Sequence, residues 1–188
     1  MKQKTSLQER IDVRNKLSNQ VLPEQGFLFL GGAGGKHICA ACINLAEYPD
    51  LVIDQTLYWR LLPEDEAYFW VGMLNSRAMT EAVAPFNPKG AFGERHLHTL
   101  PYRMMPAFDE KDDEYQRIGV LGRLLTTRAK QVIEADEYLS DPMRSLPHRR
   151  SRLRATLSQT DEGKELDELC AVSLGTSVME DPEEDINA

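Results

Sequence analysis

The spacing of the apolar residues changes at Pro63, and this change limits the fold of the chain more than any other feature. Before Pro63, short apolar runs of the length typical of strands alternate with glycines or polar residues, at 26–30, 38–45 and 51–62. After Pro63, apolar residues recur at helical spacing, beginning with Tyr68 and Val71. We therefore expect an α+β fold, in which a small mixed sheet is flanked by two long helices.

The helices have start and stop signals. Acidic residues at 64–66 suit a first helical turn, and this helix is expected to run to Pro85. Residues 109–114 open a second helix, whose apolar stripe extends to Val132. Beyond the prolines that end it, the basic stretch 149–154 predicts a short third helix.

The net charge of −8 is unevenly distributed along the chain. Residues 161–188 hold ten acidic side chains and one lysine, whereas residues 1–160 hold 21 basic and 20 acidic ones. This composition predicts an acidic, disordered tail over 159–188, and the polar residues 1–20 form a lead-in segment. The folded domain is therefore expected over residues 21–158.

Neither a membrane span nor a signal peptide is expected. No apolar run reaches membrane-spanning length, and residues 1–19 lack the apolar core of a signal peptide. The cysteines, Cys39, Cys42 and Cys170, are too few and too uneven for a disulfide framework, which fits a reducing compartment. We therefore expect a cytoplasmic protein.

The glycine-rich segment 31–35, followed by Lys36, has the composition of a phosphate-binding loop but not its spacing. A Walker loop needs a glycine five positions before the Gly-Lys pair and a hydroxyl after the lysine, where this chain has Leu30 and His37. The dinucleotide fingerprint fails as well, because His37 stands where its third glycine belongs. The segment is interpreted as a turn that brings the backbone close to a partner.

Cys39 and Cys42 have the spacing of a zinc half-site, which His96 and His98 would complete. Their small apolar neighbours instead favour cysteines packed as small hydrophobic residues in a strand, without metal. An enzyme that uses a nucleotide or a metal nevertheless stays open as an alternative.

The string Phe-Asn-Pro-Lys-Gly-Ala-Phe-Gly-Glu-Arg-His-Leu-His-Thr-Leu-Pro at 86–101 is the most distinctive part of the sequence. It resembles the C-terminal, target-recognition region of adenine-specific DNA methyltransferases of type II restriction-modification enzymes. The resemblance covers roughly residues 10–135 and includes four further segments, at 11–17, 54–59, 75–76 and 106–109.

The chain departs from that family where catalysis would reside. It has neither the Asn/Asp-Pro-Pro-aromatic tetrapeptide that holds the target amino group nor the glycine-rich loop for S-adenosylmethionine. The resemblance therefore implies a detached or truncated specificity part that is not an enzyme by itself. S-adenosylmethionine would be bound only by a separate catalytic domain, and the implied partners are duplex DNA and a methyltransferase or nuclease polypeptide.

Basic side chains near the string and on the expected third helix are the candidate DNA contacts. His96 and His98 are expected to lie nearest the bases or to stabilise the loop, and the phosphate contacts are assigned to Lys89, Arg95, Arg103, Arg149, Arg150, Arg152 and Arg154. The acidic tail would repel phosphate, so its removal is expected to strengthen binding. A protein-interaction or regulatory module without DNA contact stays open as a further alternative.

Overall fold

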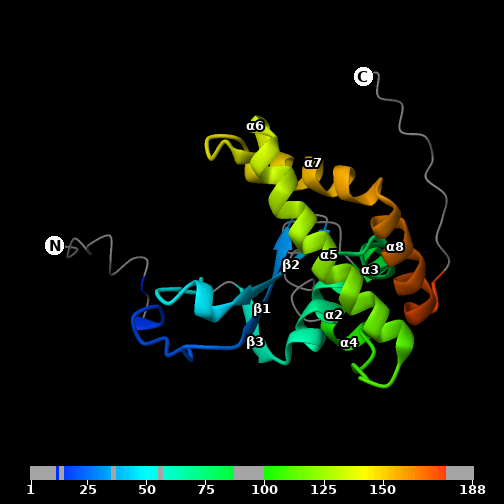
Figure 1. Cartoon of the computed structure of the whole chain (residues 1–188), viewed down its shortest axis with the longest axis horizontal. Coiled ribbons are helices and arrows are strands. Elements are labelled where there is room, and N and C mark those ends of the chain that lie inside the picture. Colours follow the sequence, from blue (N-terminus) through cyan, green and yellow to red (C-terminus); the bar gives the residue numbers. More distant parts are fainter. Residues whose placement is uncertain (1–11, 13–14, 35–36, 55–56, 87–99, 177–188) are drawn as a thin grey trace.

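The computed structural model describes residue 12 and residues 15–34, 37–54, 57–86 and 100–176 (Figure 1). Its strands come first and its α-helices follow, as the apolar spacing predicts. The elements are β1 (Phe27–Gly34), β2 (His37–Asn44), η2 (Leu45–Glu47), β3 (Tyr58–Leu62), α2 (Glu64–Asn75), α3 (Arg77–Val83), η3 (Ala84–Phe86), α4 (Leu100–Met104), α5 (Asp113–Ala135), α6 (Glu137–Ser140), α7 (Leu146–Ser158) and α8 (Asp161–Leu174). The α+β class is confirmed.

The sheet has three strands in the order β2-β1-β3, and both pairs are antiparallel. The expectation of a mixed sheet was therefore wrong. Only residues 35 and 36 join β1 to β2, which is too short for the crossover that a parallel pair needs. The expected glycine turn was also misplaced, because β1 continues through Gly34, which pairs with His37 of β2. Gly31 pairs with Ala40 and Tyr58, so it lies inside the sheet.

Only the second half of the apolar run 51–62 is a strand. Ile53 is instead buried beneath the sheet, in a small cluster with Leu28 and Leu45. The Gln20 side chain holds Ile53 in place: its oxygen accepts from the Ile53 amide at 2.8 Å, and its amide donates to the Ile53 carbonyl at 2.5 Å. A side chain thus replaces the strand partner that this segment lacks.

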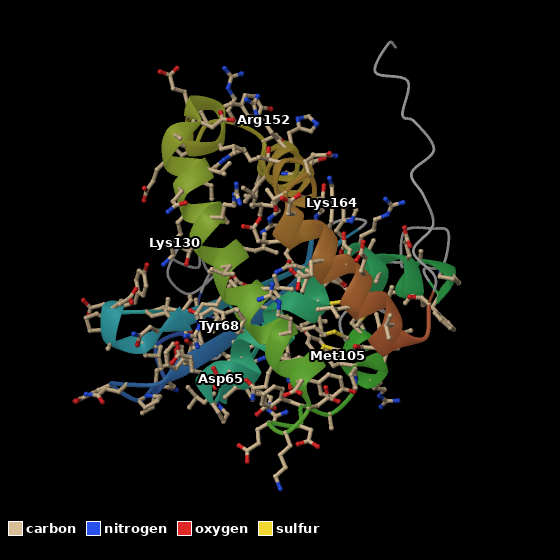
Figure 2. The ribbon with its side chains drawn as sticks, turned by 45° about the vertical axis from the view of Figure 1, so that its right-hand side comes forward. Asp65, Tyr68, Met105, Lys130, Arg152 and Lys164 are labelled. Carbon is tan, nitrogen blue, oxygen red and sulfur yellow. The ribbon has the colours of Figure 1, made fainter. Side chains whose placement is uncertain are left out.

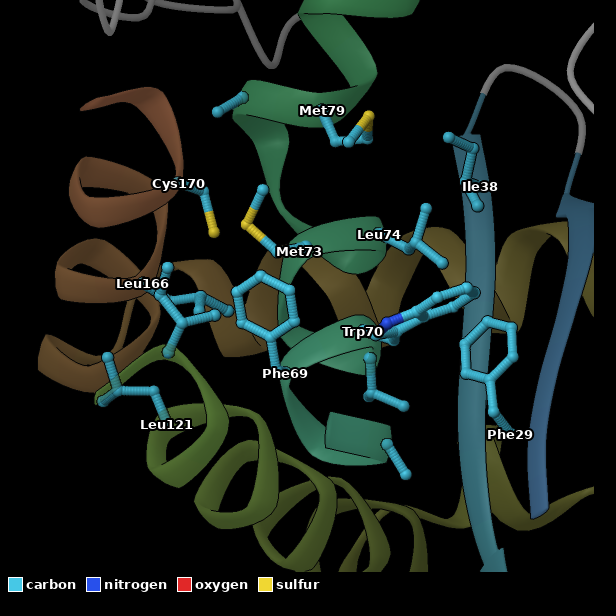
Figure 3. Close-up of a cluster of buried hydrophobic side chains, with 14 of the residues drawn as sticks. Phe29, Ile38, Phe69, Trp70, Met73, Leu74, Met79, Leu121, Leu166 and Cys170 are labelled. Atoms are coloured by element: carbon cyan, nitrogen blue, oxygen red, sulfur yellow. The ribbon is translucent and has the colours of Figure 1, made fainter. Parts of the chain in front are cut away.

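Helix α2 lies at the centre of the main core, between the sheet and the later helices (Figure 3). Trp70 and Leu74 point toward β1 and β2, while Phe69 points toward α5 and α8. Seven of its twelve residues are buried: Ala67, Phe69, Trp70, Val71, Gly72, Met73 and Leu74. Because it is covered on most of its circumference, α2 joins the sheet and the helices into one core.

The expected long helix over 64–85 is divided at Ser76. Ser76 has an extended backbone, with φ −65° and ψ 152°. Its hydroxyl donates to the Met73 carbonyl at 2.7 Å and accepts from the Met79 amide at 3.0 Å. The same side chain therefore ends α2 and caps the N-terminus of α3.

Helices α2 and α5 cross closely because α5 has glycines at the contact. A β-carbon added at Gly119 would lie 3.3 Å from the Asp65 carbonyl oxygen, and one added at Gly122 would overlap the Tyr68 carbonyl oxygen. No other residue fits at Gly122 unless the two helices move apart.

The acidic segment 161–174 is helix α8, so the prediction of disorder was wrong for these residues. Thr160 caps the helix by accepting a hydrogen bond from the Gly163 amide at 3.0 Å. Leu166, Cys170 and Ala171 are buried in the main core. Residues 177–188 lie outside the described part of the chain, and the domain boundary at 158 stays a prediction.

The acidic residues of α8 lie mostly on the side away from this apolar stripe. Glu165 pairs with Arg117 of α5 through two hydrogen bonds of 2.6 and 2.7 Å, and Glu162 pairs with Arg128 at 2.9 Å. The bond from Arg117 is the largest cause that lowers the pKa of Glu165. The negative charge is therefore compatible with a helix, because arginines of α5 offset part of it.

In the described part of the chain, none of the helices combines the length and apolar character needed to cross a membrane.

Candidate nucleic-acid interface

The structure separates the predicted DNA contacts. Lys89, Arg95, His96 and His98 lie in segment 87–99, outside the described residues. Arg103 is an exposed residue of α4, in the lower part of Figure 1. The other four arginines lie on α7, which crosses the upper part of that view, where Figure 2 labels Arg152.

Arg154 points inward and joins three elements. Its guanidinium donates to the carbonyl of Asn75 at the end of α2 (3.1 Å) and to the carbonyl of Ile38 in β2 (3.0 Å). It also lies 3.6 Å from the Cys39 sulfur. These donors are not directed at a ligand, so the contacts of Arg154 explain its presence as a structural residue.

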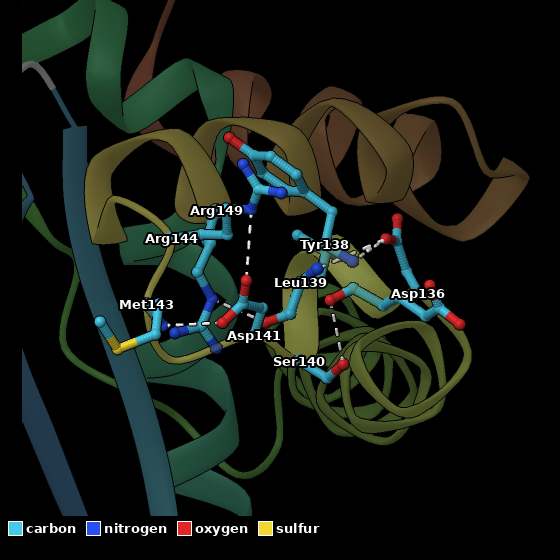
Figure 4. Close-up of polar contacts among 9 residues, drawn as sticks. Asp136, Tyr138, Leu139, Ser140, Asp141, Met143, Arg144 and Arg149 are labelled. Carbon is cyan, nitrogen blue, oxygen red and sulfur yellow. Dashed lines mark hydrogen bonds and ion pairs between the residues drawn. The ribbon is translucent and has the colours of Figure 1, made fainter.

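Arg149 and Arg152 also bind within the protein, and Figure 4 shows the contact of Arg149. Arg149 donates to the Leu139 carbonyl at 2.6 Å. Arg152 pairs with Asp136 at 2.7 Å and stacks 5.1 Å above the ring of Tyr138. Arg150 is exposed, and its side chain has no hydrogen bond or ion pair with a described residue. Of the predicted contacts, the exposed side chains of Arg103 and Arg150 therefore have no hydrogen-bond or ion-pair partner among the described residues.

This difference predicts unequal effects on stability. Replacing Arg154 with alanine is expected to lower the free energy of unfolding by about 2 kcal/mol, because two half-buried carbonyls lose a charged donor. Replacing Arg150 with alanine is expected to change it by less than about 0.5 kcal/mol, since an exposed side chain is removed. Urea denaturation of both variants measures the difference, and equal effects would show that Arg154 is not a structural link.

A second candidate surface combines aromatic and basic side chains that lie close together. Four aromatic rings meet where β1, β3, α2 and α4 converge. Phe29 lies 5.2 Å from Trp70, and Tyr102 lies 5.9 Å from Trp70 and 4.5 Å from Tyr58. Phe29 and Trp70 are buried, whereas Tyr58 is 40% exposed. The cluster therefore extends from the core to the surface, and we call Tyr58, Arg60, Tyr102 and Arg103 the aromatic–arginine face.

Gly31 gives Tyr102 its place in this face. A β-carbon at Gly31 would overlap the Tyr102 hydroxyl, so the ring can lie against β1 only because residue 31 has no side chain. Burial, and then the neighbouring Tyr58, raises the pKa of Tyr102 to about 12. The hydroxyl therefore remains protonated at neutral pH.

Arg60 completes the face with a fixed positive charge. Its guanidinium lies 5.4 Å from the centre of the Trp70 ring, a cation–π distance. Although the chain has 30 acidic residues, β1, β2, β3 and α4 contain none. Arg60 and Arg103 therefore project from elements that carry no carboxylate.

In the segments that carry the family resemblance, the described residues make contacts within the protein. The Asn75 side chain pairs with the backbone of Ala40, accepting at 3.1 Å and donating at 2.8 Å. Phe108 belongs to the segment 106–109, and the centre of its ring lies 5.2 Å from that of Phe69. The string 86–101 itself ends at the first residues of α4, directly before Tyr102.

The cysteine pair lies in β2, as predicted, and both thiols are partly buried. Cys39 is opposite Gly32 and Cys42 is opposite Phe29, so residues three apart place their side chains on opposite faces of the sheet. Burial, followed by the charge of Glu64, raises the pKa of Cys42 to about 12. Within the described residues no group of three His, Cys, Asp or Glu side chains could hold a metal ion.

Sequence reasoning missed Tyr58, Arg60 and Tyr102 as site residues. The signal for the first two was their spacing, because residues two apart in a strand point to the same face. No local sequence pattern connects these two residues with Tyr102, because Tyr102 is 44 positions further along the chain than Tyr58.

Three comparisons, with protein families, with curated proteins and with solved structures, found no match for this chain.

Proposed function

We propose that this chain is the DNA-binding specificity part of an adenine-specific DNA methyltransferase or restriction-modification system, acting in the cytoplasm without catalytic activity of its own. A methyltransferase or nuclease polypeptide supplies the chemistry. The observation that carries the proposal is the aromatic–arginine face, because it adjoins the end of the basic string 86–101 and lies on elements without a carboxylate.

The face has the chemistry that nucleic-acid sites use. Arginine donors bind phosphate oxygens and base edges, and the positive charge of Lys89, Arg95 and Arg103 would be added to that of Arg60. Absence of nearby carboxylates on these elements keeps the repulsion of phosphate low despite the net charge of −8. Phosphate contacts would position the protein, and the histidines would lie nearest the bases.

Duplex binding is expected to be salt-sensitive, with each phosphate contact contributing about 0.9 to the slope of log affinity against log salt. The variants Arg95→Ala and Arg103→Ala are each expected to lower affinity and to reduce this slope together. Fluorescence anisotropy with a labelled duplex of mixed sequence, measured from about 50 to 200 mM salt, tests both.

Lys164→Ala is the matched control, because Lys164 is an exposed cation on α8 (Figure 2). It should leave both affinity and slope unchanged. Loss of affinity at an unchanged slope would indicate that the arginine shapes the segment and does not contact phosphate. Absence of salt-dependent duplex binding by the wild-type protein would contradict the proposal.

A specific observation favours a second candidate, a protein-interaction or regulatory module of the same complex. Trp59 and Leu61 pair with Leu30 and Leu28, so they lie on the face of the sheet opposite α2. They are 39% and 45% exposed. Exposed apolar side chains of this size suit a protein partner. If Trp59→Arg abolishes a nuclease-resistant association with the catalytic polypeptide while duplex affinity stays intact, this function holds.

A further inference from the structure

The Tyr58 ring packs against two other aromatic rings and is still partly exposed. It packs against Tyr102 at 4.5 Å and against Phe29 at 6.4 Å; Phe29 belongs to the core cluster, and Tyr102 packs against that cluster. It is nevertheless 40% exposed, because β3 is an edge strand and four of its five residues are exposed. A ring held in this way is a rigid, flat surface whose conformational entropy is already lost.

Arg60 is on the same side of β3, two residues further along. Its guanidinium carbon lies 5.4 Å from the centre of the Trp70 ring, and a cation–π contact of this kind does not consume the N–H donors of an arginine. Among the described residues Arg60 has no carboxylate partner, whereas Arg117, Arg123, Arg128, Arg144 and Arg152 all do. A held guanidinium without a carboxylate is suited to a phosphate.

Together the two side chains offer an aromatic face and a cation about 7 Å apart along the strand. A base within a duplex is covered on both faces by its neighbours, so it cannot stack on a protein ring. An unpaired base can stack, and its own phosphate would then lie within reach of the cation. None of the strands contains a carboxylate that would repel this phosphate.

We infer that the aromatic–arginine face binds single-stranded nucleic acid: an unpaired base stacks on Tyr58 and Arg60 holds the adjoining phosphate. This inference rests on the proposed function, since it concerns the same face, and names unpaired nucleotides as the ligand of that face. Tyr102 is a positioning residue, because it supports the Tyr58 ring and lies against Gly31.

Fluorescence anisotropy with labelled oligothymidylate, which has little secondary structure, tests the inference. Tyr58→Leu removes the ring and is expected to weaken binding of this probe about tenfold, whereas Tyr58→Phe keeps the ring and should stay within about twofold of wild type. Arg60→Gln is expected to reduce the salt slope by about 0.7, the contribution of one phosphate of a single strand.

Tyr48→Leu is the matched control, because Tyr48 is 48% exposed and lies outside the face, directly after η2. It should leave binding unchanged, and circular dichroism of every variant checks that the fold is kept. Equal affinity of the wild type and Tyr58→Leu for oligothymidylate overturns the inference, as does an equal loss in the Tyr58→Phe and Tyr58→Leu variants.

The same measurements on a labelled duplex separate this inference from the proposed function. Binding of the duplex without oligothymidylate overturns the inference and leaves the proposed function standing. Binding of oligothymidylate without the duplex supports the inference and contradicts the proposed function. Binding of neither probe overturns both.

Discussion

Deleting residues 161–188 will abolish the cooperative unfolding transition of this protein, whereas deleting only residues 177–188 will preserve it. The longer deletion removes α8, whose Leu166, Cys170 and Ala171 are buried in the main core. Burial of a large apolar side chain contributes about 1.5–3 kcal/mol, and whole domains are stable by only about 5–15 kcal/mol. Loss of the helix therefore removes a large part of the free energy of unfolding.

Thermal unfolding followed by circular dichroism compares the two deletions. The shorter one is the control for charge, because it removes five of the ten acidic residues of the segment. It is also the form in which any repulsion of DNA by the chain end should be measured, since its core is complete. A normal transition after the longer deletion would show that α8 contributes little to the fold.

Replacing Gly122 with alanine is expected to lower the free energy of unfolding by about 2–3 kcal/mol, the upper part of the range for overpacked cores. The new β-carbon would overlap the Tyr68 carbonyl oxygen, which is backbone of a buried helix and cannot rotate away. Alanine has the higher helix propensity, worth about 1 kcal/mol, but this gain is smaller than the cost of separating α2 from α5.

Gly119→Ala is the matched control, because it makes the same substitution one turn earlier in α5. Its β-carbon would lie 3.3 Å from the Asp65 carbonyl oxygen, so a small shift accommodates it. We expect a change within about 1 kcal/mol of wild type, as helix propensity offsets part of the cost. Urea denaturation measures both variants, and similar stabilities would show that the crossing is not set by Gly122.

The parts of the fold that depend on local pattern could be predicted from the sequence. The α+β class and the strand that contains Cys39 and Cys42 follow from short apolar runs of strand length, and α5 follows from a period of 3.6 residues. The disorder predicted for 161–174 was wrong because composition was averaged over the whole acidic end. Leu166, Cys170 and Leu174 recur at helical spacing within it, and that signal was available.

The remaining features depend on contacts between distant residues. Ser76 divides a continuous apolar pattern because its hydroxyl satisfies backbone groups on both sides. Arg154 belonged to a basic run with the composition of a phosphate site, but its position turns it toward Asn75 and Ile38. The residue type thus showed correctly that this position is positively charged. Which way the Arg154 side chain points is set by the packing of α7, and the sequence does not show that packing.

The Asn75 side chain and Arg154 occupy the outer edge of β2, where Ala40 and Ile38 would otherwise present backbone groups to a further strand. Open strand edges are the places where sheets recruit additional chains. Among the described residues, β3 is the other edge of this sheet, so a strand added there by fusion, by insertion or by aggregation would place its side chains beside Tyr58 and Trp59.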